Sequence, residues 1–251
     1  MIKVEQLNKI FSDQSVIKNT TVDFEKNKVI SIIGPNGAGK STLLSMMSRL
    51  LEKDSGSIYI DGQAIEQWAT DLLAKKLAVL RQTNNVTMRF TVKELISFGR
   101  FPHSKGKLTD EDQRVIENAI NYLELTEIQD RYLDKLSGGQ RQLAFIAMVM
   151  AQDTDYILLD EPLNNLDIKH SLQIMRNIQR LAYEFKKSVI IVIHDINFAA
   201  CYSDRIIAMK KGEIVINGTV EEVINASVLE DIYETPFTVI EQNGKRICTY
   251  Y

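Results

Sequence analysis

The chain has 251 residues, which is long enough for one large domain or two small ones with a substantial buried core. Its 45% hydrophobic and 25% charged residues are typical of a globular protein. Lys and Arg total 30 against 33 acids, for a formal charge of -3, so nothing favours nucleic-acid binding, which normally shows as a basic face. Two cysteines, Cys201 and Cys248, are too few for a disulfide framework and favour a reducing compartment.

No segment is expected to cross a membrane. The residues Met1 to Glu5 show no signal peptide, and the longest unbroken apolar run, Leu143 to Ala151, is far shorter than the about 20 residues that a span requires. We therefore expect any membrane role to come through a partner.

The first third of the chain predicts two kinds of strand. Apolar residues alternate between Ile2 and Phe24, as in half-buried antiparallel strands. Val29–Ile33 is continuously apolar and β-branched apart from one serine, as in a buried parallel strand, and leads through a glycine-rich turn into a helical pattern over 41–51. The run 57–60 predicts a strand that ends in a tight turn.

The remainder predicts helices, then a parallel core, then hairpins. Residues 92–150 are almost wholly helical in pattern, with a capping box at Thr109 and Asp112. Strands at 156–159 and 189–193 flank a helix over 168–185, a spacing that implies a parallel core. Hairpins are predicted at 205–216 and at 237–250, and a capped short helix begins at Thr219. The sequence gives the last hairpin no function.

Residues 34–42 fit the phosphate-loop pattern G-x-x-x-x-G-K-[ST]. They read Gly34-Pro35-Asn36-Gly37-Ala38-Gly39-Lys40-Ser41-Thr42. Glycines let successive backbone N–H groups surround phosphate oxygens, and the following helix adds its positive end. Lys40 would reach the β- and γ-phosphates and Ser41 would bind Mg²⁺. The alternative is an ordinary glycine turn, which the preceding strand and following helix make less favoured.

Two acids follow the predicted strand at 156–159. An acid at the end of a buried strand is unfavourable unless a cation or donor meets it, so Asp160 suits Mg²⁺ and Glu161 suits a general base for water. Two solvated acids in a surface turn are the alternative.

A third motif, Leu136-Ser137-Gly138-Gly139-Gln140, precedes an apolar helix. It places a serine and two glycines at a second helix start, where anions bind. An N-cap serine after a glycine turn is the plain structural alternative.

With these three motifs in this order, the chain resembles the ABC ATPases over nearly its whole length. The resemblance implies an α/β P-loop fold with a mainly parallel core sheet, an antiparallel β subdomain and a helical signature subdomain. We expect one domain, with a nucleotide-binding core at about 1–85 and 152–217, a helical part at about 86–151 and a tail at about 218–251.

The resemblance also implies a site shared between two copies of the chain. Ser137 and Gly139 of one copy would contact the γ-phosphate of ATP that the other copy holds, and Asp167 would lie at the interface. Gln82 would touch Mg²⁺ and water, and His194 would bond the γ-phosphate. Phe11 would stack on adenine, whereas His103 and His170 have no comparable support.

The resulting expectations are specific. The catalytic residues are Lys40, Gln82, Glu161 and His194, and the Mg²⁺ ligands are Ser41, Gln82 and Asp160. The nucleotide-binding residues are Phe11, Gly34, Pro35, Asn36, Gly37, Ala38, Gly39, Lys40, Ser41, Thr42, Ser137, Gly138, Gly139, Gln140 and Asp167.

The expected function is transport. Non-transport members typically carry two cassettes or a long coiled-coil insertion, and this chain shows one motif set and no heptad run. The segments Val92–His103 and Glu161–Asp167 resemble those of ferric-siderophore importers, especially petrobactin-type systems, with haem and vitamin B12 importers next. We expect a homodimer at the cytoplasmic face of the cell membrane, with integral-membrane permease subunits and an extracytoplasmic substrate-binding protein. A soluble ABC ATPase that acts on ribosomes or DNA is the alternative.

Overall fold

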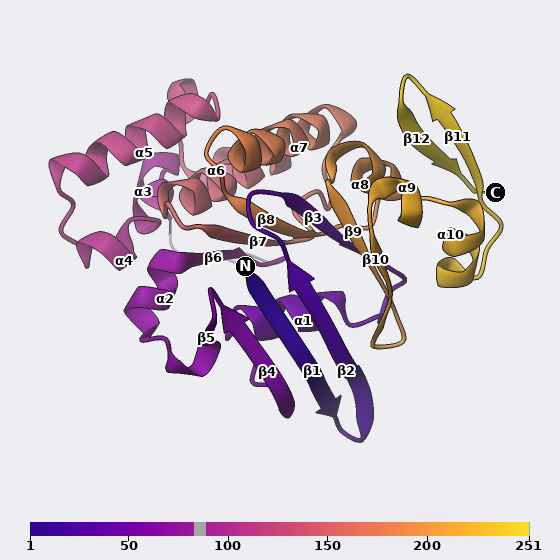
Figure 1. Cartoon of the computed structure of the whole chain (residues 1–251). Helices are drawn as coiled ribbons and strands as arrows, with labels where there is room; N and C mark the ends of the chain where they lie inside the picture. The colour runs from indigo at the N-terminus through magenta and orange to yellow at the C-terminus, as the bar shows by residue number, and fades with distance from the viewer. Residues whose placement is uncertain (83–88, 251) are drawn as a thin grey trace. The chain divides into compact units, whose positions relative to one another are not determined.

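The structure is a computed structural model that describes residues 1–82 and 89–250 (Figure 1). The chain divides into two compact units, Met1–Trp68 with Ile178–Tyr251, and Ala69–Asn177. The boundary expected near residue 85 lies outside the described residues.

An antiparallel sheet in the first unit begins the chain. Its strands are β1 (Ile2–Phe11), β2 (Gln14–Phe24), β4 (Ser55–Ile60) and β5 (Gln63–Ala64), in the order β2-β1-β4-β5. Ile2 pairs with Phe24 on one side and with Ile60 on the other, and all three side chains are buried. The alternation in the sequence therefore predicted this sheet correctly, although β4 starts two residues earlier than expected.

The second sheet of this unit is mainly parallel. β3 (Val29–Ile33) lies between β8 (Ser188–Val192) and β9 (Arg205–Lys210) and runs parallel to both, and β10 (Glu213–Gly218) pairs antiparallel with β9. Every residue of β3 and β8 is buried, which explains their continuous apolar runs. The predicted parallel core and the β9–β10 hairpin are confirmed.

The helices of the first unit differ more from expectation. They are α1 (Lys40–Met47), η1 (Ile65–Gln67), α8 (Ile196–Tyr202), α9 (Val220–Val223) and α10 (Ala226–Tyr233). The predicted helix over 41–51 was too long, because Arg49 adopts a left-handed conformation (φ 58°) and Leu50 N–H donates to the Ser45 carbonyl, closing a Schellman-type end. The capping box at Thr219 is confirmed, whereas α10 was not predicted.

The tail hairpin is also present. β11 (Thr238–Gln242) and β12 (Lys245–Thr249) pair antiparallel around Asn243 and Gly244, both at positive φ. A two-residue turn of this kind requires left-handed conformations, which Asn-Gly supplies.

The second unit is mostly helical. Its elements are α2 (Thr70–Lys76), β6 (Leu77–Leu80), α3 (Val92–Phe98), α4 (Phe101–Ser104), α5 (Asp110–Tyr122), η2 (Thr126–Ile128), η3 (Leu133–Lys135), α6 (Gly138–Ala151) and β7 (Tyr156–Asp160). β6 runs parallel to β7, and neither α2 nor β6 was predicted. α7 (Ile168–Tyr183) begins in this unit and ends in the first.

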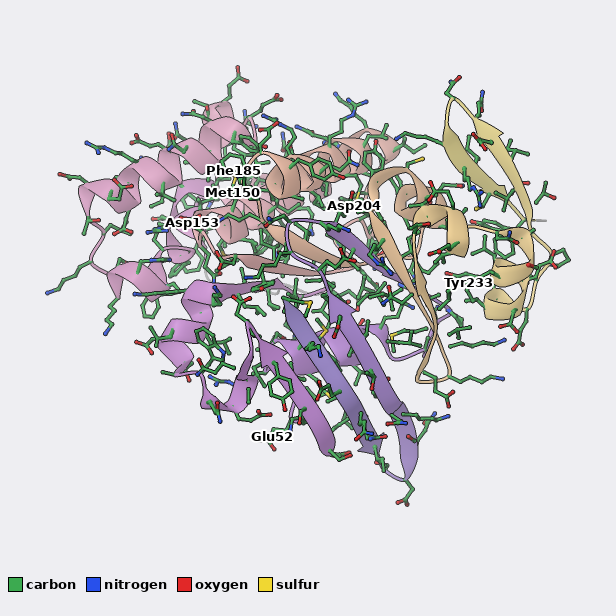
Figure 2. The ribbon with its side chains drawn as sticks, in the orientation of Figure 1. Glu52, Met150, Asp153, Phe185, Asp204 and Tyr233 are labelled. Atoms are coloured by element: carbon green, nitrogen blue, oxygen red, sulfur yellow. The ribbon has the colours of Figure 1, made fainter. Side chains whose placement is uncertain are left out.

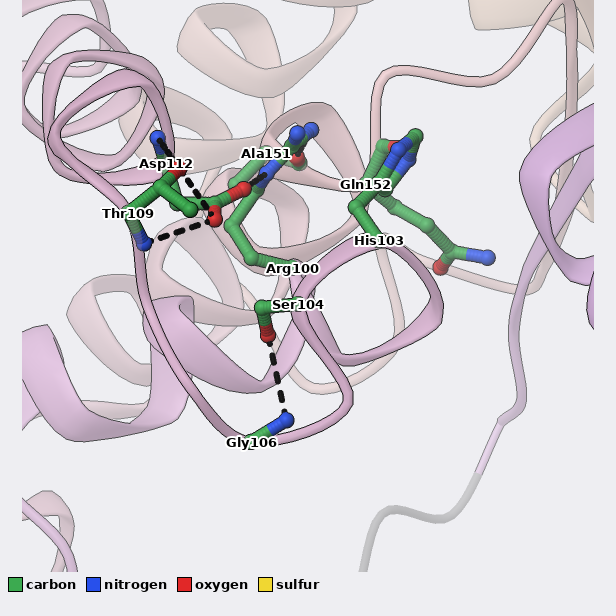
Figure 3. A network of polar contacts seen from close by, with 8 residues as sticks. All are labelled: Arg100, His103, Ser104, Gly106, Thr109, Asp112, Ala151 and Gln152. Carbon is green, nitrogen blue, oxygen red and sulfur yellow. Dashed lines mark hydrogen bonds and ion pairs between the residues drawn. The ribbon is translucent and has the colours of Figure 1, made fainter.

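A polar network fixes the end of α6 in the second unit (Figure 3). Arg100 donates from Nε to Asp112 Oδ1 at 2.8 Å and from Nη1 to the Ala151 carbonyl at 2.9 Å. The pKa of Asp112 is lowered to about 2, chiefly by the hydrogen bond from the Thr109 backbone N–H and next by the hydrogen bond from Arg100. The Nε2 of His103 lies 3.0 Å from the Gln152 carbonyl oxygen. Arg100 and His103 of the Val92–His103 segment thus have structural roles.

Candidate nucleotide site

The phosphate loop lies in the first unit, between β3 and α1. Gly39 is the N-cap of α1 and makes no side-chain cap bond. The backbone N–H groups of the first turn of a helix point away from the helix body, which here is toward the loop. Gly34 has φ 141°, and a Cβ there would lie 2.0 Å from the carbonyl oxygen of Met209 on β9. Only glycine allows the backbone at this position to pack so closely against β9. The result is a concave backbone turn of the kind that binds anions.

The ammonium group of Lys40 lies over this turn. The residue is 5% exposed, and Nζ donates to the carbonyls of Gly34 at 2.8 Å and Pro35 at 3.0 Å. A buried ammonium needs such partners. Because both carbonyls belong to the loop itself, the positive charge is held where the loop would receive phosphates.

His194 emerges at the same sheet edge. β3 and β8 are parallel, and Ile32 pairs with Val192, so Gly34 and His194 each follow their paired residue by two positions. The carboxyl ends of neighbouring parallel strands are where ligands of open α/β sheets bind. The structure therefore brings the predicted histidine and the phosphate loop together, and His194 is exposed there.

Phe11 ends β1 and is 44% exposed. Lys9 Nζ lies 5.2 Å from the centroid of its ring, and Asp54 accepts from both Lys9 Nζ and the Ile10 N–H. These contacts fix the strand end and leave part of the ring surface accessible. Stacking on adenine stays a prediction.

The two acids after β7 lie in the second unit. All five residues of β7 are buried, Asp160 included, and Glu161 follows in a left-handed conformation (φ 49°). A non-glycine residue in this region is under strain, a feature that clusters at functional sites. Oε2 of Glu161 accepts from Gln82 Nε2 and from Asn164 Nδ2, both at 2.5 Å.

Gln82 reaches Glu161 because their strands are neighbours. Leu80 of β6 pairs with Leu159 of β7, and Gln82 and Glu161 each follow by two positions. The sequence placed both residues in the site but did not predict this bond, and it gave Asn164 no role. The one sequence feature that could have indicated the bond between Asn164 and Glu161 is their separation of three residues.

The third motif opens α6, also in the second unit. Ser137 is the N-cap: its Oγ accepts from the Gln140 N–H, and Gln140 Oε1 accepts from the Ser137 N–H, both at 3.2 Å. The predicted helix start is therefore confirmed, and within one chain Ser137 also fills the capping role.

Gly139 and Asp167 meet the same side chain. A Cβ on Gly139 would lie 2.3 Å from the ring of His170, whose Nδ1 lies 2.8 Å from Asp167 Oδ1. The His170 backbone N–H also bonds this oxygen and is the first cause of a lowered pKa of Asp167. His170, which the sequence left without a role, thus links two of the predicted interface segments.

The chain is similar in sequence to a known family and to known proteins. The ABC transporter family model matches residues 17–164. The petrobactin import ATP-binding protein YclP of Bacillus subtilis (strain 168) is 55% identical over 251 residues, covering 100% of both chains. The petrobactin import ATP-binding protein FatE of Bacillus anthracis is 49% identical over 250 residues, again covering 100% of both. This chain belongs to the ABC transporter family.

A solved structure extends the likeness of this ABC ATPase to three dimensions. A dimeric bacterial ABC transporter cassette has a TM-score of 0.77 at 30% identity, over 88% of this chain and 99% of its own. The same cassette has been solved with ADP and Pi bound, which supports the assignment of nucleotide binding to this fold. Within the described part of this ABC ATPase, no helix is both long and apolar enough to span a bilayer.

Proposed function

We propose that this chain is the ATP-hydrolysing subunit of an importer that carries a ferric siderophore across the cytoplasmic membrane. The observation that carries the proposal is its identity of 55% and 49%, over the full length, to two ATPases that are named for petrobactin import. It would work as a homodimer at the cytoplasmic face, with a separate permease and an extracytoplasmic substrate-binding protein.

Residues of the first unit would bind the nucleotide. The loop from Gly34 to Thr42 would surround the phosphates, with Lys40 supplying positive charge, and Phe11 would stack on adenine. His194 would bond the γ-phosphate. Phosphoryl transfer needs positioning and charge neutralisation more than covalent help from the protein. A pre-formed loop with its ammonium already in place supports that role.

The side chains predicted to bind Mg²⁺ carry oxygen donors of the kind that this ion prefers. Ser41 offers a hydroxyl in the first unit, and Asp160 and Gln82 offer a carboxylate and an amide oxygen in the second. Each of these would suit Mg²⁺ by its chemistry alone, since the ion takes oxygen ligands, usually one or two carboxylates with substrate phosphates. Asp160 is 7% exposed at the end of β7, where a cation is the favoured partner of a carboxylate. When bound, the ion would neutralise charge on the β- and γ-phosphates.

Glu161 would act on the attacking water. The amides of Gln82 and Asn164 hold its carboxylate in one orientation, which is what a positioned general base requires. Ser137, Gly138, Gly139 and Gln140 of the partner copy would close over the γ-phosphate, with Asp167 at the interface.

The test is uptake of labelled iron by a strain that lacks the gene. The strain is complemented with wild type, with Glu161→Gln, or with Glu184→Gln, a matched carboxylate-to-amide change at a surface ion pair with Arg180. Ferric petrobactin, a ferric hydroxamate and haem are supplied separately. We expect wild type and Glu184→Gln to restore uptake of one ferric siderophore, and Glu161→Gln to fail.

Other outcomes contradict the proposal. Restoration of haem uptake alone would move the cargo outside the siderophores. Uptake of every supplied compound at the wild-type rate in the deletion strain, with no redundant ATPase present, would contradict the transport role.

A further inference from the structure

The tail helix α10 touches the phosphate loop. Tyr233 is the last residue of α10 (Figure 2). Its hydroxyl oxygen lies 3.1 Å from the backbone nitrogen of Gly34, which donates to it. Gly34 is buried, and a buried N–H needs an acceptor. The hydroxyl of Tyr233 is that acceptor, although 199 positions separate the two residues.

Gly34 also contacts Lys40. Its carbonyl accepts from Lys40 Nζ at 2.8 Å, so Tyr233 bonds one side of the residue and Lys40 the other. A rotation of Gly34 that followed loss of the tyrosine bond would therefore also move the carbonyl on which the ammonium rests.

A second link joins the same end of α10 to the far side of the loop. Glu234 lies 3.1 Å from Lys210 Nζ and 3.7 Å from Lys211 Nζ, and Lys210 Nζ also donates to the carbonyl of Asp231. In the same turn, Gly212 N–H donates to the Ala38 carbonyl at 3.2 Å. The end of α10 thus supports the loop at Gly34 directly and at Ala38 through the β9–β10 turn.

The remainder of the tail fixes Tyr233. Its ring lies 5.7 Å from that of Phe237, which in turn lies 5.3 Å from Tyr250. β12 is bonded to α8, since the Asn197 amide donates to the Cys248 carbonyl at 3.1 Å and accepts from the Cys248 N–H at 2.7 Å. Burial raises the pKa of Tyr233 to about 12, so the hydroxyl stays protonated near neutral pH.

We propose that Tyr233 is a positioning residue for the nucleotide site, and that the C-terminal tail supports the phosphate loop in the conformation that binds ATP. This inference rests on the proposed role of residues 34–42. Without the hydroxyl, the buried Gly34 N–H lacks its acceptor and the loop populates other conformations. Apparent affinity falls in proportion to the binding-competent fraction, and one net hydrogen bond corresponds to a factor of about 3 to 10.

The experiment compares Tyr233→Phe with a matched control, Tyr183→Phe. The control removes a hydroxyl that donates to Asp204 Oδ1 at 2.9 Å in the same unit. Equilibrium binding of Mg²⁺-ATP and steady-state hydrolysis are measured on the full chain with its copurified permease. We expect Tyr233→Phe to raise Kd and KM about 3- to 10-fold with kcat within about twofold of wild type, and Tyr183→Phe to change none of them.

Lys40→Ala separates the two ways of failing. If Lys40→Ala loses ATP binding while Tyr233→Phe binds like wild type, the inference is overturned and the site assignment stands. If both tyrosine variants weaken ATP binding equally, general destabilisation of the fold explains the loss better than positioning of the loop, and the inference is again overturned. If Lys40→Ala binds ATP like wild type, the site assignment itself is wrong.

Discussion

Replacing Arg100 by methionine removes the cation from a buried ion pair of the second unit (Figure 3). The Arg100 and Asp112 side chains are 8% and 5% exposed, and Nε lies 2.8 Å from Oδ1. Methionine keeps much of the apolar stem. It leaves the Asp112 carboxylate without its counter-charge and the Ala151 carbonyl without its donor.

The magnitude follows from what remains. Breaking a buried pair by removing one partner costs about 3–5 kcal/mol. Asp112 keeps the backbone N–H and the hydroxyl of Thr109, so we expect the lower end, about 3 kcal/mol. With a urea m-value of about 2–3 kcal/mol/M, the unfolding midpoint falls by about 1 M.

Urea unfolding followed by far-ultraviolet circular dichroism at pH 7 measures this loss. The control is Arg114→Met, which makes the same change in a pair where Arg114 and Glu111 are 74% and 72% exposed, and such pairs contribute about 0–1 kcal/mol. Adding Asp112→Asn to Arg100→Met should recover part of the loss. The reasoning is refuted if Arg100→Met is as stable as Arg114→Met, or if the two buried substitutions destabilise additively.

Two further predictions concern acid and packing. The pKa of Asp112 is about 2 in the fold, below its ordinary value, so the ionised carboxylate contributes its full share to the free energy of unfolding above about pH 4. That contribution is lost as the pH falls toward 2. The urea midpoint of Asp112→Asn should therefore fall less steeply than that of wild type between pH 5 and pH 2. Gly139→Ala places a Cβ 2.3 Å from the His170 ring and should cost about 1–3 kcal/mol by thermal unfolding, whereas at Gly138 the nearest atom would be 3.8 Å away and alanine should fit. Equal melting temperatures for the two alanine variants would contradict the packing argument.

The elements that the sequence predicted well carry a local signal. β3 and β8 are continuously apolar because both faces are buried. The capping boxes at Thr109 and Thr219 were recognised because cap and acid lie three residues apart. Lys211-Gly212 and Asn243-Gly244 mark hairpins because each pair adopts positive φ.

The elements that it missed depend on tertiary contacts or on unusual caps. β6 is a four-residue strand directly after α2, and its leucines continue a helical spacing; pairing with β7 decides the outcome. The end of α1 has arginine at the left-handed position where glycine is usual, so no residue type marks it. α10 did carry a signal, since Asn225 caps it through the Ser227 N–H.

For the site, the sequence could supply residue types and their order but not their partners. The phosphate-loop pattern located Lys40, yet only the fold shows the carbonyls that hold it. The bond from Gln82 to Glu161 joins residues 79 positions apart, and follows from the parallel pairing of β6 and β7. Tyr233 could not be found at all, because its contact with Gly34 depends on how the tail packs.

The most direct test of the central claim is hydrolysis of Mg²⁺-ATP by wild type and by Glu161→Gln, with ATP binding and oligomeric state measured on the same samples. Glutamine keeps an oxygen that can accept from Gln82 and Asn164 but cannot take a proton from water. We predict that the variant binds ATP, hydrolyses it about 10²- to 10⁴-fold more slowly and accumulates as a closed dimer. Hydrolysis by Glu161→Gln at the wild-type rate would contradict the account.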